Sequence, residues 1–110
     1  MIKLANFGSF HVGGRRLKLS GQPVETIQFT GATSFENDPN GDYQIEQAYI
    51  QYFIPEERKY NLPVLLVHGG GMTGSNWETT PDGRPGWLHR FLEMGFATYV
   101  IDNVERGRSG

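Results

Sequence analysis

Apolar and polar residues alternate along the first part of the chain, and this period of two predicts β-strands. The segment 7–19 (FGSFHVGGRRLKL) alternates on both sides of Gly13 and Gly14, which predicts a β-hairpin with the two glycines as its turn. The segment 25–30 (ETIQFT) predicts a third strand, although its alternation is imperfect. The chain is therefore expected to begin as antiparallel β-structure.

A loop and a long strand complete this first region. The segment 31–42 (GATSFENDPNGD) is rich in residues that favour turns, so it predicts a loop. The segment 43–54 (YQIEQAYIQYFI) predicts a long strand with apolar residues on both of its faces. Region 7–54 is accordingly expected to form an antiparallel β meander.

The second half of the chain changes character. The continuous apolar run Val64-Leu65-Leu66-Val67 predicts a strand over 62–68 that is buried on both faces. The spacing of apolar residues predicts a short amphipathic helix over 85–94, with Pro85 as its first residue and Gly95 as its stop. A second apolar run over 96–102 predicts another strand. Strand, helix and strand form one βαβ crossover with parallel strands, so the fold class is α/β with a mixed sheet.

The residues that follow the two parallel strands carry the candidate chemistry. His68, Gly69, Gly70 and Gly71 come directly after the first strand, and glycines let backbone N–H groups turn out toward a ligand. A buried strand that runs into HGGG is typical of the oxyanion loop of α/β-hydrolase lipases and esterases. The loop 102–110 follows the second strand, and the carboxyl ends of parallel strands face a common crevice.

A long polar loop with two tryptophans separates the glycines from the helix. Met72, Trp77 and Trp87 are candidates for pocket walls, because loops that hold large aromatic residues shape a pocket or anchor themselves to the core. Of these two roles, the pattern favours anchoring.

Composition excludes several classes of function. The chain has 110 residues, a net charge of −2 and no cysteine, with acidic and basic residues spread along it. No basic surface for nucleic acid is expected, and thiol nucleophiles and disulfides are excluded. No run approaches the roughly 18 apolar residues of a membrane span. The histidines are dispersed and no carboxylate cluster accompanies them, so no metal site is predicted.

Two polar side chains near the carboxyl end of the sequence invite a catalytic interpretation. Ser109 lies in Gly107-Arg108-Ser109-Gly110, but a nucleophile elbow has Gly-x-Ser-x-Gly between a strand and a helix. Ser109 is therefore not expected to be a nucleophile. Asp102 stands at a strand end, where an acid more often organises the loop than takes part in catalysis.

The sequence resembles a known family from about Phe7 to Gly110. The residues HGGGMTGSNWETTPDGRPGW, followed by MGFATYVID and RGRSG, are similar to the amino-terminal half of the bacterial and fungal α/β-hydrolases grouped around the Alcaligenes esterase 713 type. The opening GSFHVGGR followed by LSG is similar to the first hairpin of that family. The WETTPDGR block is its most specific signature.

This resemblance implies a serine hydrolase that acts on carboxylic esters, needs no cofactor and has its triad in the order Ser, acid, His. The oxyanion amides would come from Gly70 as the best candidate and Gly71 as the next, together with an amide just after the nucleophilic serine, and His68 would hold the loop by hydrogen bonding. In that order the triad follows the loop 102–110, so His11 and His89 are not expected in it. Residues 1–110 would then be the amino-terminal part of one α/β-hydrolase domain, and a complementary C-terminal polypeptide would carry the nucleophile.

Other classes of function remain open from the sequence. The chain can also be a non-catalytic small-ligand binding module, or an interaction subunit that pairs an exposed strand edge with a partner. A homo-oligomer is equally compatible with the residues. No signal peptide is recognised in the chain as given, so its location, cytoplasmic or exported after signal removal, stays open.

Overall fold

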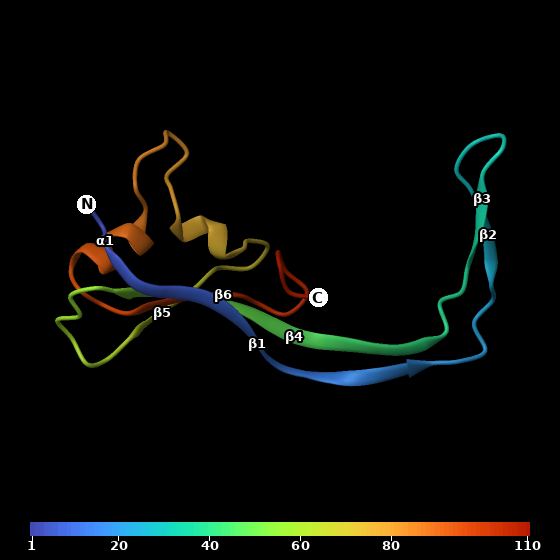
Figure 1. The fold of residues 1–110 in the computed structure, drawn as a ribbon, viewed down its shortest axis with the longest axis horizontal. Coiled ribbons are helices and arrows are strands. Elements are labelled where there is room, and N and C mark those ends of the chain that lie inside the picture. Colours follow the sequence, from blue (N-terminus) through green and yellow to red (C-terminus); the bar gives the residue numbers. More distant parts are fainter. The chain divides into compact units, whose positions relative to one another are not determined.

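The computed structural model describes every residue from Met1 to Gly110. The chain forms two compact units, one made of Met1–Gly14 with Glu46–Gly110 and the other of Arg15–Ile45. The main sheet has four strands in the order β1-β4-β6-β5 (Figure 1). Their bounds are Leu4–Leu19 for β1, Gly41–Pro55 for β4, Thr98–Asp102 for β6 and Val64–Val67 for β5.

The sheet is mixed, as the sequence predicted. β5 runs parallel to β6, with Val64 opposite Thr98 and Val67 opposite Ile101. β4 runs antiparallel to β6, and Tyr49 lies opposite Asp102. β6 therefore lies between β4 and β5, which puts the last strand of the sequence inside the sheet and leaves β5 at its edge.

Two helices cover one face of this sheet. The α-helix α1 (Trp87–Glu93) and the single 3₁₀ turn η1 (Gly74–Trp77) follow β5 in the chain (Figure 1). Leu88 and Leu92 of α1 form a buried cluster with Leu66 of β5 and Val100 of β6. Neither helix has the length and apolar character that a membrane crossing needs.

The prediction that the strand at 62–68 is buried on both faces is wrong for this chain. Leu66 is buried, but Leu65 is 55% exposed and Val67 is 50% exposed. The reason is topological, because α1 and η1 cover only one face of β5 and no strand of the chain pairs with its outer edge.

Helix α1 begins two residues later and ends one residue earlier than the predicted 85–94, and Gly95 follows its end as predicted. Gly86, in an extended conformation, is its N-cap, so Pro85 lies before the helix. At the other end Gly95 has a φ of 93°. The Phe96 N–H donates to the Phe91 carbonyl and the Gly95 N–H donates to Leu92, which is the Schellman pattern of a helix that ends at glycine.

The predicted hairpin at 7–19 is wrong. β1 is a single strand of 16 residues that continues through Gly13 and Gly14 and neighbours the 15-residue β4. Both glycines have positive φ, as does Glu46 on β4. Positive φ suits a bulge within a strand pair as well as a turn, so the glycines bend the strand here without reversing it.

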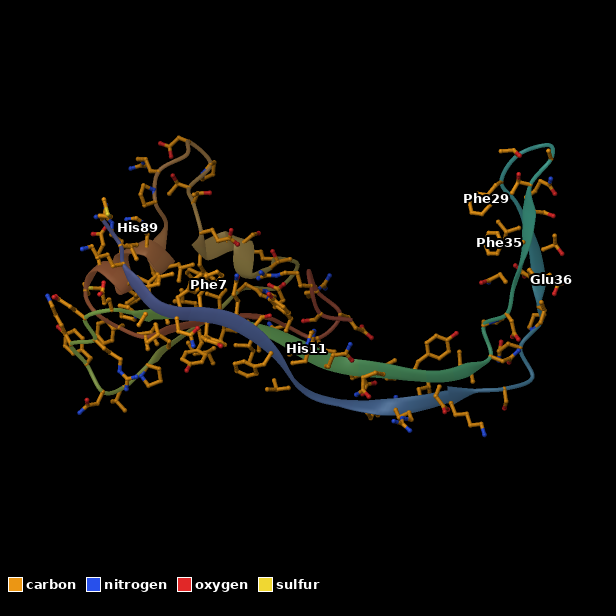
Figure 2. All side chains as sticks on the ribbon, viewed as in Figure 1. Phe7, His11, Phe29, Phe35, Glu36 and His89 are labelled. Carbon is orange, nitrogen blue, oxygen red and sulfur yellow. The ribbon has the colours of Figure 1, made fainter.

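The second unit corrects the predicted loop at 31–42 in part. β3 (Ser34–Asn37) lies within that segment and pairs antiparallel with β2 (Glu25–Gln28). The rings of Phe29 and Phe35 stack beside this ladder, 4.9 Å apart (Figure 2). In the order of the sequence, β2 and β3 thus come between β1 and β4, which neighbour each other in the main sheet.

Candidate functional site

The loops that follow β5 and β6 leave the sheet at the same edge. Because the two strands are parallel and neighbouring, the chain that continues from Val67 and the chain that continues from Asp102 emerge side by side. Every polar residue that the sequence singled out near a strand end belongs to one of these two loops. The carboxyl edge of the β5–β6 pair is therefore the candidate site.

His68 links the two loops. Its side chain is buried, and its Nε2 accepts a hydrogen bond from the Asn103 N–H at 2.9 Å. An Nε2 that accepts carries no proton, so the neutral ring has its proton on Nδ1, which donates to the Gly69 carbonyl at 2.7 Å. The imidazole thus fixes the start of the glycine loop against the end of β6 and has no nitrogen left for another partner.

The glycine loop leaves backbone donors unused. The Met72 N–H donates to the Gly69 carbonyl at 3.2 Å and closes a tight turn. Within that turn the N–H groups of Gly70 and Gly71 donate no hydrogen bond to the chain. Gly71 has a φ of 76°, in the region that favours glycine. Both glycines are exposed, and a Cβ at either position would meet no atom within 4 Å.

Asp102 is the buried anion of the site. Its Oδ1 accepts from the Gly74 N–H at 2.7 Å, and its Oδ2 accepts from the Arg108 N–H at 2.8 Å and the Arg108 Nε at 2.9 Å. Burial by itself would raise the pKa of the carboxyl group, but the hydrogen bonds and charge of Arg108, with the Gly74 amide, lower this pKa to about 2. Asp102 is therefore a charged anchor for both loops.

Glycines are required where the backbone approaches this carboxylate. A Cβ at Gly74 would lie 2.8 Å from Oδ1 of Asp102, and a Cβ at Gly107 would lie 2.6 Å from Oδ2. Because the carboxylate is enclosed this closely and its oxygens are already engaged, it has little room to orient a further group.

Ser109 closes the end of the β4–β6 ladder. It is buried, its hydroxyl donates to the Asp102 carbonyl at 2.6 Å, and the same oxygen accepts from the Tyr49 N–H at 2.8 Å. The Arg108 guanidinium lies 4.3 Å from the centre of the Tyr49 ring and donates to Gln51 at 2.9 Å. The Ser109 hydroxyl is therefore engaged in hydrogen bonds that hold the loop 102–110 to β4.

The tryptophans line a cavity that is separate from the glycine loop. The rings of Trp77 and Trp87 lie 5.3 Å apart at 39°. Trp77 packs against the core, whereas Trp87 is 62% exposed. A cavity of about 660 Å³ lies beside them and is lined by Asn76, Trp77, Thr79, Thr80, Pro81 and Trp87, together with Gly86. Met72 is exposed and lies outside this lining.

The remaining histidines do not join the site. Figure 2 shows His11 on β1 and His89 on α1, and they lie apart from each other. The ring of His11 contacts Tyr49 edge-on at 5.4 Å, and His89 pairs with Glu93 at 2.6 Å. No group of three or more His, Asp or Glu side chains lies close enough together to hold a metal ion.

Two parts of this arrangement, the polar wall of the cavity and the contact between Arg108 and Gln51, were not predicted from the sequence. The polar wall of the cavity, Thr79 and Thr80, lies in a loop whose closure depends on backbone hydrogen bonds. The link from Arg108 to Gln51 joins residues 57 positions apart. The turn residues of TTPDGRPG are a local pattern that favours a closed loop, whereas no local pattern indicates the contact between Arg108 and Gln51.

Comparison with known proteins identifies relatives among lipases and esterases. No protein-family model matches the sequence. The chain is 37% identical over 101 residues to a probable secreted lipase, phiG, of a fungal species (strain ATCC 74256), covering 92% of this chain and 25% of that protein. It is also 42% identical, with a TM-score of 0.80, to the atomic-resolution structure of a novel bacterial esterase. That match covers 100% of this chain and 31% of the esterase chain.

These matches confirm the predicted resemblance to esterases of the α/β-hydrolase type. The chain spans only 25% of the fungal lipase and 31% of the bacterial esterase. Within that span the structural match includes all of the present chain, with both the antiparallel and the parallel parts of its sheet.

Proposed function

We propose that this chain, a relative of bacterial and fungal esterases and lipases, is the amino-terminal portion of a serine carboxylic-ester hydrolase with an α/β-hydrolase fold. In this proposal residues 1–110 supply the oxyanion hole and a pocket wall, and the Ser-acid-His triad lies in a further segment or a complementary C-terminal polypeptide. The observation that carries the proposal is that the N–H groups of Gly70 and Gly71, two exposed residues at the carboxyl end of β5, donate no hydrogen bond to the chain.

Ester hydrolysis by a serine requires hydrogen-bond donors beside the carbonyl oxygen of the ester. A serine oxygen of the further segment attacks the ester carbonyl carbon while a histidine of that segment takes the serine proton. The carbonyl oxygen becomes an oxyanion, and the amides of Gly70 and Gly71 donate hydrogen bonds to it. The tetrahedral intermediate then collapses, the alcohol leaves with the proton from the histidine, and water releases the acid from the acyl-enzyme by the same route.

The placement of the two amides supports this role because they are held before any substrate binds. His68 fixes the start of their loop to Asn103, and Asp102 fixes its end through the Gly74 N–H. Donors that need no reorganisation are the ones that stabilise developing charge most effectively. The side chains at the same edge are occupied in holding this loop, which supports a contribution from backbone amides over one from side chains.

The first test is the position of the nucleophile in the complete protein that carries these residues. A fluorophosphonate, followed by peptide mapping, should label one serine outside residues 1–110, and an intact-mass spectrum shows whether that serine belongs to the same polypeptide. Label on Ser109, or on any other serine within 1–110, would overturn the proposal.

The second test removes one oxyanion donor. Gly70→Pro deletes the N–H, whereas Gly70→Ala keeps it at a position with open space and no positive φ. Loss of one such donor lowers kcat by about 100- to 1,000-fold. We expect that loss for the proline variant and near-normal turnover for the alanine variant. Equal activity of the two variants at equal thermal stability would contradict the assigned role.

The tryptophan cavity favours a second candidate function, that of a small-ligand binding module without catalysis. It has the volume of a ligand site, since such sites span about 300–1,000 Å³. This candidate replaces the first one if the complete protein binds a ligand in the cavity and no serine reacts with the fluorophosphonate.

A further inference from the structure

The cavity beside Trp77 and Trp87 is lined only by uncharged residues. Two indole rings and the Pro81 ring provide flat apolar surface, and Asn76, Thr79 and Thr80 provide neutral polar groups. None of the lining residues carries a charge. Flat apolar walls select a ring, and a wall without charge gives no compensation for the desolvation of an ionic ligand.

The loop that forms this wall is closed by its own hydrogen bonds. The Gly86 N–H donates to the Glu78 carbonyl at 2.9 Å, and the Thr80 N–H donates to the Arg84 carbonyl at 2.8 Å. A Cβ at Gly86 would lie 2.5 Å from the Trp77 carbonyl oxygen, so the two ends of the loop are in close contact. The ring surfaces are therefore held in place without a ligand, which lowers the entropic cost of binding.

One wall residue has an unmet hydrogen-bonding requirement. The indole N–H of Trp77 is buried and donates no hydrogen bond within the chain. Buried donors are normally paired, and tryptophan at binding sites commonly uses its N–H for an acceptor on the ligand. Because this nitrogen has no solvent exposure, a small shift of the indole is needed before a ligand oxygen reaches it.

We propose that the cavity beside Trp77 and Trp87 binds a neutral ring that carries a hydrogen-bond acceptor, and that this ring is the alcohol or acyl group of the ester substrate. The assignment of the ring to the substrate rests on the proposed esterase function, whereas binding of the ring does not. Stacking on the exposed face of Trp87 supplies the affinity, and the neutral polar wall selects against carboxylates.

Binding is tested on the complete protein without turnover, by calorimetric titration with N-benzylacetamide. Phenylacetate is the charged control, N-hexylacetamide is the control without a ring, and methyl glucoside tests a sugar ring. We expect N-benzylacetamide to bind at least tenfold more tightly than each control. Equal affinity for phenylacetate or N-hexylacetamide, or binding of the glucoside alone, would overturn the proposal.

Site-directed variants locate the binding. Trp87→Ala removes the exposed ring, and Phe7→Ala is its matched control, since Phe7 is an aromatic residue of similar exposure, 65% against 62%, outside the cavity lining. Trp87→Ala should weaken N-benzylacetamide binding roughly tenfold, in line with the contribution of a stacked ring, whereas Phe7→Ala should leave it unchanged. Unchanged affinity in Trp87→Ala places the ligand elsewhere, or shows that another part of the protein covers the cavity, and rejects the proposal.

A kinetic comparison links the cavity to the reaction. In the wild-type protein kcat/KM for benzyl acetate should exceed that for hexyl acetate, and Trp87→Ala should lower kcat/KM for the benzyl ester more than that for the hexyl ester, which removes this preference. If the protein binds N-benzylacetamide but hydrolyses neither ester, the esterase proposal fails and the binding site stands. If both esters are hydrolysed and Trp87→Ala changes neither binding nor preference, the cavity proposal fails alone.

Discussion

Replacement of the buried carboxylate by its neutral isostere gives the sharpest test of how the site is held together. Asp102 is 1% exposed and accepts three hydrogen bonds, from the Gly74 amide and from two nitrogens of Arg108. Asp102→Asn keeps the shape of the side chain but has only one acceptor oxygen. Its NH₂ group faces N–H donors, with which it cannot form a hydrogen bond. The variant therefore loses both the charge and part of the hydrogen bonding.

The magnitude follows from the pKa and from the count of unpaired donors. A carboxyl pKa lowered from 3.8 to about 2 corresponds to about 2 kcal/mol of folding free energy at neutral pH. An unpaired buried N–H costs about 1–3 kcal/mol. The cost is smaller for the Arg108 side chain, because it is 40% exposed and water can replace the hydrogen bond that it loses. We expect Asp102→Asn to lower the free energy of unfolding by about 2 to 4 kcal/mol at pH 7.

The sign of the pH dependence is fixed by the direction of the shift. The pKa of Asp102 is lower in the folded state, so its contribution is complete above the unfolded pKa of 3.8 and is lost as pH falls toward 2. The deficit of Asp102→Asn should therefore be constant from pH 7 to 5 and should shrink between about pH 4 and pH 2. Urea unfolding of the complete protein across this range measures both quantities.

The chain contains a matched control for this experiment. Asp82 pairs with Arg84 at 2.9 Å, the same distance as the Asp102–Arg108 pair, but its two side chains are 74% and 61% exposed. The Thr80 hydroxyl and then Arg84 lower the pKa of Asp82 as well, yet a solvent-screened pair contributes little to stability. Asp82→Asn should leave the urea midpoint almost unchanged. Equal losses in the two variants would refute the reasoning, as would an Asp102→Asn deficit that persists unchanged at pH 2.

Three further substitutions separate structural from catalytic roles. Ser109→Ala leaves the partly buried Tyr49 N–H and the Asp102 carbonyl without this partner, so stability should fall by about 1–3 kcal/mol, while fluorophosphonate labelling of the complete protein should remain intact. Gly86→Ala forces a Cβ against the Trp77 carbonyl oxygen and should cost about 1–3 kcal/mol in urea unfolding, whereas Gly70→Ala, at an open position, should be neutral. His68→Phe keeps the ring volume but removes two hydrogen bonds, and it should lower stability and kcat together, with KM changing less.

The parts of the fold that the sequence predicted are those with strong local signals. The apolar runs at β5 and β6 and the glycine stop of α1 each reflect interactions within a few residues, and Gly95 adopts the positive φ that its position requires. β3 was missed because Phe35 is its only large apolar residue, and it gains stability from pairing with β2 and from the stack on Phe29.

Strand order could not be predicted from these patterns. The apolar character of β5 suits a strand that is covered on both faces, and it does not reveal that β6 lies between β5 and β4. Gly13 and Gly14 illustrate the same limit, since positive φ at two glycines serves a turn or a bulge equally well. Only the long β4 beside β1 shows which of the two occurs.

The candidate site shows why residue type alone misleads at a strand end. His68, Asp102 and Ser109 are the residue types of a catalytic triad, and all three lie at the carboxyl edge of the β5–β6 pair. Each is buried and has its hydrogen-bonding atoms engaged by the backbone or by Arg108, so a catalytic role would require the loops to release them. The backbone amides of Gly70 and Gly71, in contrast, donate no hydrogen bond to the chain. Under the proposed function, this edge uses its reactive side chains to hold the loops in place, the amides of Gly70 and Gly71 stabilise the developing negative charge, and the nucleophile comes from outside these residues.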